Sequence, residues 1–328
     1  MTPFDHAQSV SGASGRAAES PRGKPKAVKL RLVEKVKTDP SRDELLTDFG
    51  KKTLIDRYLL PGESFQDMFA RVSTAYADDA WSRRLDEAFS AVFETECTVL
   101  PLATGTAANS VTLAAMVPPW GAVMCHERAH IECDEGGAPE FYTGGAKLTL
   151  VGEADKMTPE ALERAVLGEE VRGVHGAQRG PVALTNVTEG GHVYTGTELA
   201  ALCAVAKRYG LPVHLDGARF ANACLATNVT PAEMTWKIGV DAVSFGGTKN
   251  GLLGVEAVVF FDPAHAMEFE YRRKRGGHLF SKHRYLSAQM QAYLTDDLWR
   301  ETACMANDRM ARLAEGLRAC PQVTLTTE

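Results

Sequence analysis

From residue 98 onward the sequence alternates short apolar runs with helical stretches, and this alternation constrains the fold more than any other feature. The runs that predict strands are TVLPLA, GAVMC, AKLTLVG, GPVALTNV, LPVHLD, DAVSFGG and GVEAVVFF. Residues 197–209 carry apolar side chains at helical spacing before Gly210, and Thr158-Pro159-Glu160 has the composition of a helix start. Strands that alternate with helices predict βαβ units, a mostly parallel sheet and therefore an α/β fold.

Three of these apolar runs end in residues that can carry chemistry, and ligands of such sheets bind at the carboxyl ends of the strands. TVLPLA leads into Thr104-Gly105-Thr106, a helix start whose free backbone N–H groups suit a phosphate. LPVHLD ends at Asp216, which can hold a pyridine nitrogen protonated, and DAVSFGG is followed by Lys249, whose amine can form a Schiff base. Each feature alone is common, but together and in this order they predict a site for pyridoxal 5'-phosphate.

A different chemistry is indicated by residues 126–130, HERAH, which match the pattern H-E-x-x-H. On a helix, this spacing would put two imidazoles and a glutamate together, as in zinc-dependent peptidases. The segment follows directly on the apolar run GAVMC, however, and no third ligand stands at a familiar spacing. Cys125 and Cys133 could widen a metal site, although buried cysteines more often only pack. We therefore expect no metal, and a zinc hydrolase is the less favoured alternative.

Composition narrows the possible partners and the location. The 328 residues are enough for two domains, and a net charge of −6 argues against a general nucleic-acid binder or an anionic membrane surface. No apolar run approaches the roughly 18 residues of a membrane span. Seven cysteines without a signal peptide predict reduced thiols in a cytoplasmic protein, and the Ser-, Gly-, Pro- and Arg-rich residues 1–27 predict a disordered tail.

Several longer stretches carry a more specific signal: WSRRLDEAF, ATGTAAN, HERAHIECDEGGAPEF, HLDGARFANA, SFGGTKNGLLGVEA and KRGGHLFSKHRYLSAQM. Through them, residues 81–325 resemble the low-specificity threonine aldolases of the β-eliminating lyase group, which are fold-type I pyridoxal-phosphate enzymes. The resemblance implies an aminotransferase-like large domain and a homodimer or homotetramer. It also implies a lyase that cleaves L-threonine and L-allo-threonine to glycine and acetaldehyde by retro-aldol Cα–Cβ cleavage.

The same resemblance implies a set of cofactor-binding residues. Lys249 would bind the cofactor covalently, and Asp216 would pair with its ring nitrogen. Gly105 and Thr106 would hold the phosphate. Lys282 falls where the family offers a basic residue to the phosphate of a neighbouring subunit.

Two further residues receive substrate roles from the resemblance. Arg219 would take the carboxylate of the amino acid. His130 would stack on the cofactor ring near the substrate hydroxyl and, directly or through a water, is the candidate base that removes its proton. Under this interpretation Asp134 and Glu135 belong to the cofactor site and its surroundings, whereas His126 and Glu127 have no role.

The two ends of the sequence depart from the resemblance. Residues 45–79 resemble the amino-terminal part of a ribonucleotide reductase large subunit, and the seam at 76–81 indicates a recombined or artificial junction. We find no Ser-Asp-Asn segment that would add a serine to the carboxylate site, and we expect the small domain with its second arginine to be truncated. The predicted organisation is a tail at 1–27, a reductase-like segment at 28–79, a cofactor-binding large domain at 80–285 and the start of a small domain at 286–328. An alternative is a catalytically impaired chimeric chain that keeps cofactor binding.

Overall fold

The computed structural model describes residues 39–57, 59–69, 80–152, 155–169 and 171–325. The predicted tail at 1–27 and most of the predicted seam at 76–81 lie outside these residues. Near the amino terminus, the 3-10 helix Pro40–Leu45 is followed by α1, Asp48–Arg57, and the side chain of Asp39 caps the first of these helices. The reductase resemblance of 45–79 stays a prediction.

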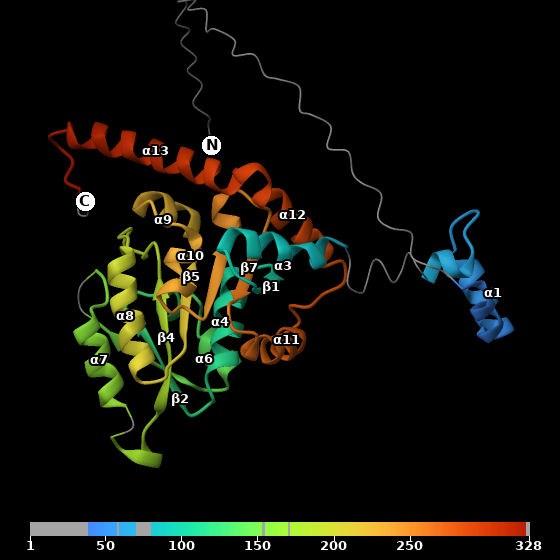
Figure 1. The fold of residues 1–328 in the computed structure, drawn as a ribbon, viewed down its shortest axis with the longest axis horizontal. Helices are drawn as coiled ribbons and strands as arrows, with labels where there is room; N and C mark the ends of the chain where they lie inside the picture. Colours follow the sequence, from blue (N-terminus) through green and yellow to red (C-terminus); the bar gives the residue numbers. More distant parts are fainter. Residues whose placement is uncertain (1–38, 58, 70–79, 153–154, 170, 326–328) are drawn as a thin grey trace, which may run out of the picture. The chain divides into compact units, whose positions relative to one another are not determined.

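One sheet organises the described chain from residue 98 onward, and each of the predicted apolar runs forms a strand in it. The strands follow the order β1-β7-β6-β5-β4-β2-β3 (Figure 1). Their bounds are Thr98–Leu102 (β1), Gly121–His126 (β2), Lys147–Val151 (β3), Gln178–Thr185 (β4), Val213–Gly217 (β5), Ala242–Gly246 (β6) and Glu256–Phe260 (β7). Strands β2 to β6 pair in parallel, whereas β7 is antiparallel to both β1 and β6. The prediction of a mostly parallel α/β sheet is confirmed.

Helices connect and cover the strands. Their bounds are Ala80–Phe93 (α3), Gly105–Met116 (α4), His130–Cys133 (α5), Ala138–Thr143 (α6), Pro159–Gly168 (α7), Gly196–Arg208 (α8), Phe220–Thr227 (α9), Pro231–Met234 (α10), Ala266–Arg275 (α11), Arg284–Leu294 (α12) and Leu298–Arg318 (α13). Thr158 caps α7 by accepting a hydrogen bond from the N–H of Ala161, as its sequence predicts. Helix α8 begins one residue before the predicted range because Thr195 and Glu198 form a capping box there.

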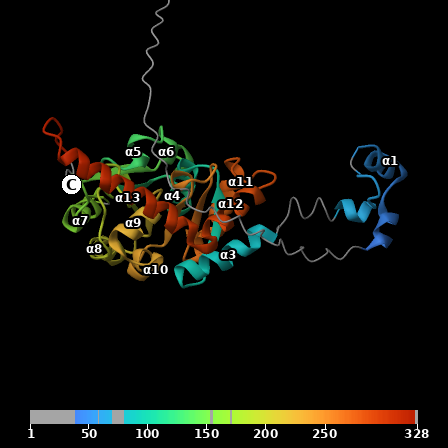
Figure 2. The ribbon, with the colours of Figure 1, turned by 90° about the horizontal axis from the view of Figure 1, so that it is seen from above.

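Two apolar layers hold these helices against the sheet. One layer joins α4 and α11 to β1, β6 and β7 through residues such as Val111, Phe260 and Phe269. The other layer joins α3, α8 and α12 to the opposite face, where the ring of Phe245 packs edge-on against Phe89 at 5.2 Å. Figure 2 shows α13 running beside α9, and both helices contribute side chains to this second layer. No helix of the described residues is long and apolar enough to cross a membrane.

Candidate active site

The three predicted chemical groups lie at the same edge of the sheet. Asp216 is near the end of β5, where it pairs with Thr185 of β4 and Ser244 of β6. Glu256 at the start of β7 pairs with Leu102 at the end of β1 and with Gly246 at the end of β6, so the ends of β1 and β6 lie at the same edge of the sheet. Helix α4 starts three residues after β1 ends, and Lys249 lies three residues after the end of β6. The structure therefore brings the amino-terminal end of α4, the carboxylate of Asp216 and the amine of Lys249 to one edge of the sheet.

Glycines allow the loops at this edge to touch. A Cβ on Gly246 would lie 2.3 Å from the carbonyl oxygen of Ala218, in the loop that follows Asp216. A Cβ on Gly247 would lie 2.5 Å from the carbonyl oxygen of Val255. Side chains at either position would push the lysine loop away from its neighbours, so the glycines of SFGGTKNG fix the approach of Lys249 to the site.

The neighbour of Lys249 anchors the lysine loop. The amide nitrogen Nδ2 of Asn250 donates to the hydroxyl of Tyr293 and, at 2.8 Å, to the carbonyl oxygen of Trp299. The Tyr293 hydroxyl in turn donates to the carbonyl of Gly246 at 3.3 Å. Helices α12 and α13 therefore hold the backbone of the loop, while the side chain of Lys249 itself is exposed.

The start of α4 has free donors and open space. Thr104 uses its hydroxyl to accept from the N–H of Ala107 at 3.1 Å, which leaves the first helical N–H groups, those of Gly105 and Thr106, without an intrahelical acceptor. A Cβ placed on Gly105 would meet no atom within 4 Å. An anion can therefore approach these N–H groups closely at the positive end of the helix.

Asp216 is buried, with 5% of its surface exposed, and both of its carboxylate oxygens accept hydrogen bonds. Oδ1 accepts from the backbone N–H of Ala218 at 3.0 Å, and Oδ2 accepts from Nδ2 of Asn109 at 2.8 Å. The same amide nitrogen of Asn109 donates to Oε1 of Glu135 at 2.9 Å. One amide of α4 thus bridges two buried carboxylates.

Glu135 connects this bridge to His130. Nδ1 of His130 lies 2.9 Å from Oε1 of Glu135, and the hydroxyl of Ser110 donates to Oε2 at 3.2 Å. Burial raises the pKa of Glu135, while the hydrogen bonds from Asn109 and His130 oppose that rise. The described contacts therefore form one buried polar chain that runs from Asp216 through Asn109 and Glu135 to His130.

His214 lies two residues before Asp216 on the same strand. Its Nε2 is 2.9 Å from the hydroxyl of Ser244, and its side chain is fully buried. Burial lowers the pKa of His214 to about 4, against the opposing attraction of Asp216. The imidazole is therefore neutral at pH 7 and does not neutralise the carboxylate beside it.

The HERAH segment does not form the helix that the zinc pattern requires. His126 is the last residue of β2, whereas His130 is the first residue of α5. Nδ1 of His126 accepts from the N–H of Arg128 at 3.1 Å, and Nδ1 of His130 faces Glu135. Among the described residues, no group of three or more His, Cys, Asp or Glu side chains is placed to hold a metal ion. The two imidazoles therefore belong to different local structures.

The remaining predicted site residues lie at the margin. Arg219 precedes α9, and its Nη1 is 3.9 Å from Oε1 of Glu189 in the loop after β4. Both side chains are partly exposed, so this ion pair is weak and open to competition by another carboxylate. Lys282 is exposed just before α12, with a φ of 65°, and does not belong to the buried polar chain.

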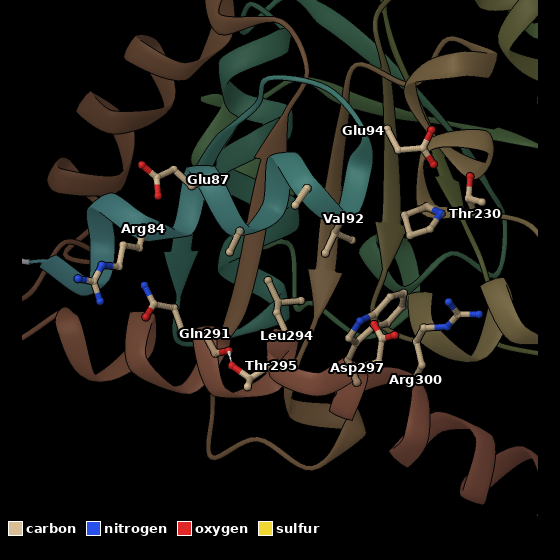
Figure 3. A pocket seen from close by; sticks show the side chains of 14 residues that line it. Arg84, Glu87, Val92, Glu94, Thr230, Gln291, Leu294, Thr295, Asp297 and Arg300 are labelled. Atoms are coloured by element: carbon tan, nitrogen blue, oxygen red, sulfur yellow. Dashed lines mark hydrogen bonds between the residues drawn. The ribbon is translucent and has the colours of Figure 1, made fainter. Parts of the chain in front are cut away.

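A cavity of about 740 Å³ lies elsewhere, among α3, α10, α12 and α13 (Figure 3). Its lining mixes charged and apolar side chains, among them Arg84, Glu87, Val92, Leu294 and Arg300. None of the predicted site residues lines it. The candidate site therefore rests on the convergence of strand ends and not on the size of a cavity.

Comparison with known proteins decides what kind of site this is. The profile of the β-eliminating lyase family matches residues 67–327. The chain belongs to this family. The low-specificity L-threonine aldolase of Pseudomonas aeruginosa is 44% identical over 252 residues, a region that covers 76% of this chain and 72% of that protein.

Solved structures agree with the β-eliminating lyase assignment. A threonine aldolase from Leishmania major has a TM-score of 0.71 and 26% identity, with 87% of this chain and 77% of that chain covered. An aspartate aminotransferase from Thermus thermophilus shares the fold, with a TM-score of 0.58 and 17% identity. The matched region covers 76% of this chain and 66% of that chain. The predicted aminotransferase-like, fold-type I architecture is confirmed.

Pyridoxal phosphate is the cofactor of the β-eliminating lyases, and the described residues fit it. The open space at Gly105 suits a phosphate, and the buried Asp216 suits a ring nitrogen that carries a proton. The exposed amine of Lys249 is free to reach an aldehyde carbon. Each of these features is a property of the chain itself.

Sequence patterns assigned no role to Asn109 or Ser110, and the family resemblance placed Glu135 in the cofactor site and its surroundings without naming its contacts. A signal was present, because Asn109 and Ser110 stand side by side in a helix whose residues from 107 to 114 are all buried. Buried polar side chains are nearly always hydrogen-bonded, so this pair predicts a polar partner inside the protein. The identity of that partner depends on the tertiary fold.

Proposed function

We propose that the chain is a pyridoxal-phosphate-dependent lyase that cleaves L-threonine and L-allo-threonine to glycine and acetaldehyde. The observation that carries the proposal is the convergence of Asp216, the Lys249 loop and the start of α4 at one sheet edge. The 44% identity to a low-specificity L-threonine aldolase supplies the reaction and the substrate class.

In this proposal six residues bind the cofactor, and one of them, His130, stacks on its ring. Lys249 binds its aldehyde carbon, and Asp216 keeps its ring nitrogen protonated. Gly105 and Thr106 bind its phosphate through backbone N–H groups. Lys282 reaches the phosphate of a neighbouring subunit in a homodimer or homotetramer, which its exposure beside α12 permits.

The bound cofactor supplies an electron sink for the pair left on Cα when the Cα–Cβ bond breaks. Arg219 binds the substrate carboxylate in place of Glu189, and so orients the bond to be broken. His130, directly or through a water, accepts the proton of the β-hydroxyl, and the Cβ fragment leaves as acetaldehyde. A proton delivered to Cα completes glycine.

We further propose the division into 28–79, 80–285 and 286–328, and a cytoplasmic location. The family profile begins at residue 67, so it includes the end of the segment that resembles a reductase. All of the cysteines are free thiols, which supports a reducing compartment.

The test is acetaldehyde release from L-threonine and from L-allo-threonine by the full chain loaded with pyridoxal phosphate. We expect release from both substrates, and loss of at least 10³-fold in kcat for Asp216→Asn, because a neutral amide cannot stabilise the ring-nitrogen proton. Cofactor binding without acetaldehyde release would instead support the impaired chimeric alternative. A tightly bound zinc that is lost with His130→Asn would support the hydrolase.

A further inference from the structure

We propose that Glu135 is a positioning residue that orients His130 for proton transfer and, through Asn109, braces Asp216. Its effect on turnover rests on the proposed function, whereas its effect on the imidazole does not. The family resemblance places Glu135 in the surroundings of the cofactor site but gives it neither of these two tasks.

Glu135 is a carboxylate held without a cationic Lys or Arg partner in the contacts of the described chain. Its side chain is fully buried, and its two oxygens face His130, Asn109 and Ser110. Burying a carboxylate in this way is unfavourable and raises the pKa of Glu135. An apolar residue would pack at this position without the desolvation penalty of a carboxylate, so the presence of a glutamate indicates a specific task and not packing alone.

The contact with His130 defines that task. A carboxylate only accepts hydrogen bonds, so the 2.9 Å contact places the proton of the neutral imidazole on Nδ1. The lone pair then lies on Nε2, and 26% of the His130 side chain is exposed. When Nε2 takes a proton, the negative charge of Glu135 stabilises the imidazolium that forms.

Asn109 extends the effect of Glu135 to Asp216. Its two amide hydrogens are divided between Glu135 at 2.9 Å and Asp216 at 2.8 Å, and its Oδ1 is buried without a hydrogen-bond partner. The orientation of the amide is therefore determined by the two carboxylates together. The titratable groups that act on Glu135 are His130 from α5 and Asp216 from β5, while α4 contributes only the neutral Asn109 and Ser110.

The first experiment measures which ring nitrogen of His130 carries the proton in the parent chain, and it uses a variant only to assign the NMR signals. Histidine-labelled full chain is followed by two-bond ¹⁵N–¹H correlation NMR across pH, and the His130 signals are identified by their loss in His130→Asn. We expect the neutral ring to carry its proton on Nδ1. A neutral ring protonated on Nε2 would overturn the proposal.

The second experiment compares Glu135→Gln with Glu132→Gln, which makes the same chemical change at an exposed carboxylate of the same segment. Because a glutamine presents an amide NH₂ as well as an oxygen to the ring, Glu135→Gln should give a measurable population of the neutral ring protonated on Nε2, whereas Glu132→Gln leaves the proton on Nδ1. Equal behaviour of the two variants would refute a specific role for Glu135. Should Glu135→Gln fail to fold, Glu135→Asp keeps the charge and is expected to keep the proton of the neutral His130 ring on Nδ1, and a neutral ring protonated on Nε2 there would count against the proposal.

Activity supplies a separate readout. In a chain that releases acetaldehyde, Glu135→Gln should lower kcat by about 10²-fold with a smaller change in KM. Glu135→Asp should recover part of kcat. If the parent chain releases no acetaldehyde, the proposed function fails, but the NMR results still decide whether Glu135 positions His130.

Discussion

Asn109→Ala tests the buried polar chain most directly, because it removes one amide from between two carboxylates. Asn109 is 2% exposed and donates to Asp216 at 2.8 Å and to Glu135 at 2.9 Å. A hydrogen bond to a charged group contributes about 1.5–3 kcal/mol, so the upper bound for the loss is about 3–6 kcal/mol. Water or protonation at the carboxylates will recover part of this, and we expect a loss of about 3 kcal/mol at pH 7.

The matched control is Asn222→Ala. Asn222 also donates from a helix, but to the neutral side chain of Asn307 at 2.9 Å and in a half-buried position. A neutral hydrogen bond contributes about 1 kcal/mol. The assay is urea unfolding of the full chain without cofactor. If Asn109→Ala lowers the free energy of unfolding no more than Asn222→Ala does, the two carboxylates do not depend on Asn109.

The pH dependence of the same loss gives a second check. Burial raises the pKa of Glu135 above the ordinary value of 4.5. The contribution of Glu135 to the free energy of unfolding is therefore largest below pH 4.5 and decreases as the pH rises to the pKa of the folded state. Asn109 lowers that pKa, and Asn109→Ala removes the opposing effect. The deficit of the variant should therefore be larger at pH 8 than at pH 5. An equal deficit at both values would refute the role of charge.

Three further predictions concern single residues of the site. Borohydride reduction of the loaded chain followed by peptide mapping should find the pyridoxyl group on Lys249, and Lys249→Arg should abolish it while Lys237→Arg, a surface control, leaves it in place. Because burial lowers the pKa of His214 from 6.5 to about 4, the stability that depends on neutral His214 is complete above pH 6.5. On the order of 3 kcal/mol should be lost from pH 6.5 to 4, and His214→Gln should flatten this part of the unfolding profile. Arg219→Ala should raise the KM for threonine about 10- to 100-fold, and an unchanged KM would remove Arg219 from the carboxylate site.

Local features of the sequence predicted the strands and several helix ends because their causes are local. Apolar runs of strand length identified β1 to β7, and the threonine before Pro159 identified the start of α7. The antiparallel direction of β7 was not predicted, because strand direction depends on how the connections cross the sheet. The H-E-x-x-H match shows the converse, since the residue spacing was right for a helix but the backbone places His126 in a strand.

The candidate site divides in the same way. Asp216, Lys249 and the start of α4 were predictable because each follows directly on an apolar run. The partners of Asn109 and Glu135 were not predictable, because their hydrogen bonds join residues 26 and 107 positions apart in the sequence. A short sequence pattern records which groups stand at a strand end but not which buried partners hold them.

The lysine loop shows that the site also depends on the carboxyl-terminal helices. Tyr293 and Trp299 are almost fully buried, and their rings pack on Phe245 with centroid distances of 6.1 and 5.6 Å. The same two residues accept the hydrogen bonds of Asn250, beside Lys249. Helices α12 and α13 therefore pack on Phe245 of β6 and also hold the lysine loop through hydrogen bonds to Asn250. Because one pair of residues performs both tasks, weakened docking of α13 should disturb the lysine loop and the packing on β6 together.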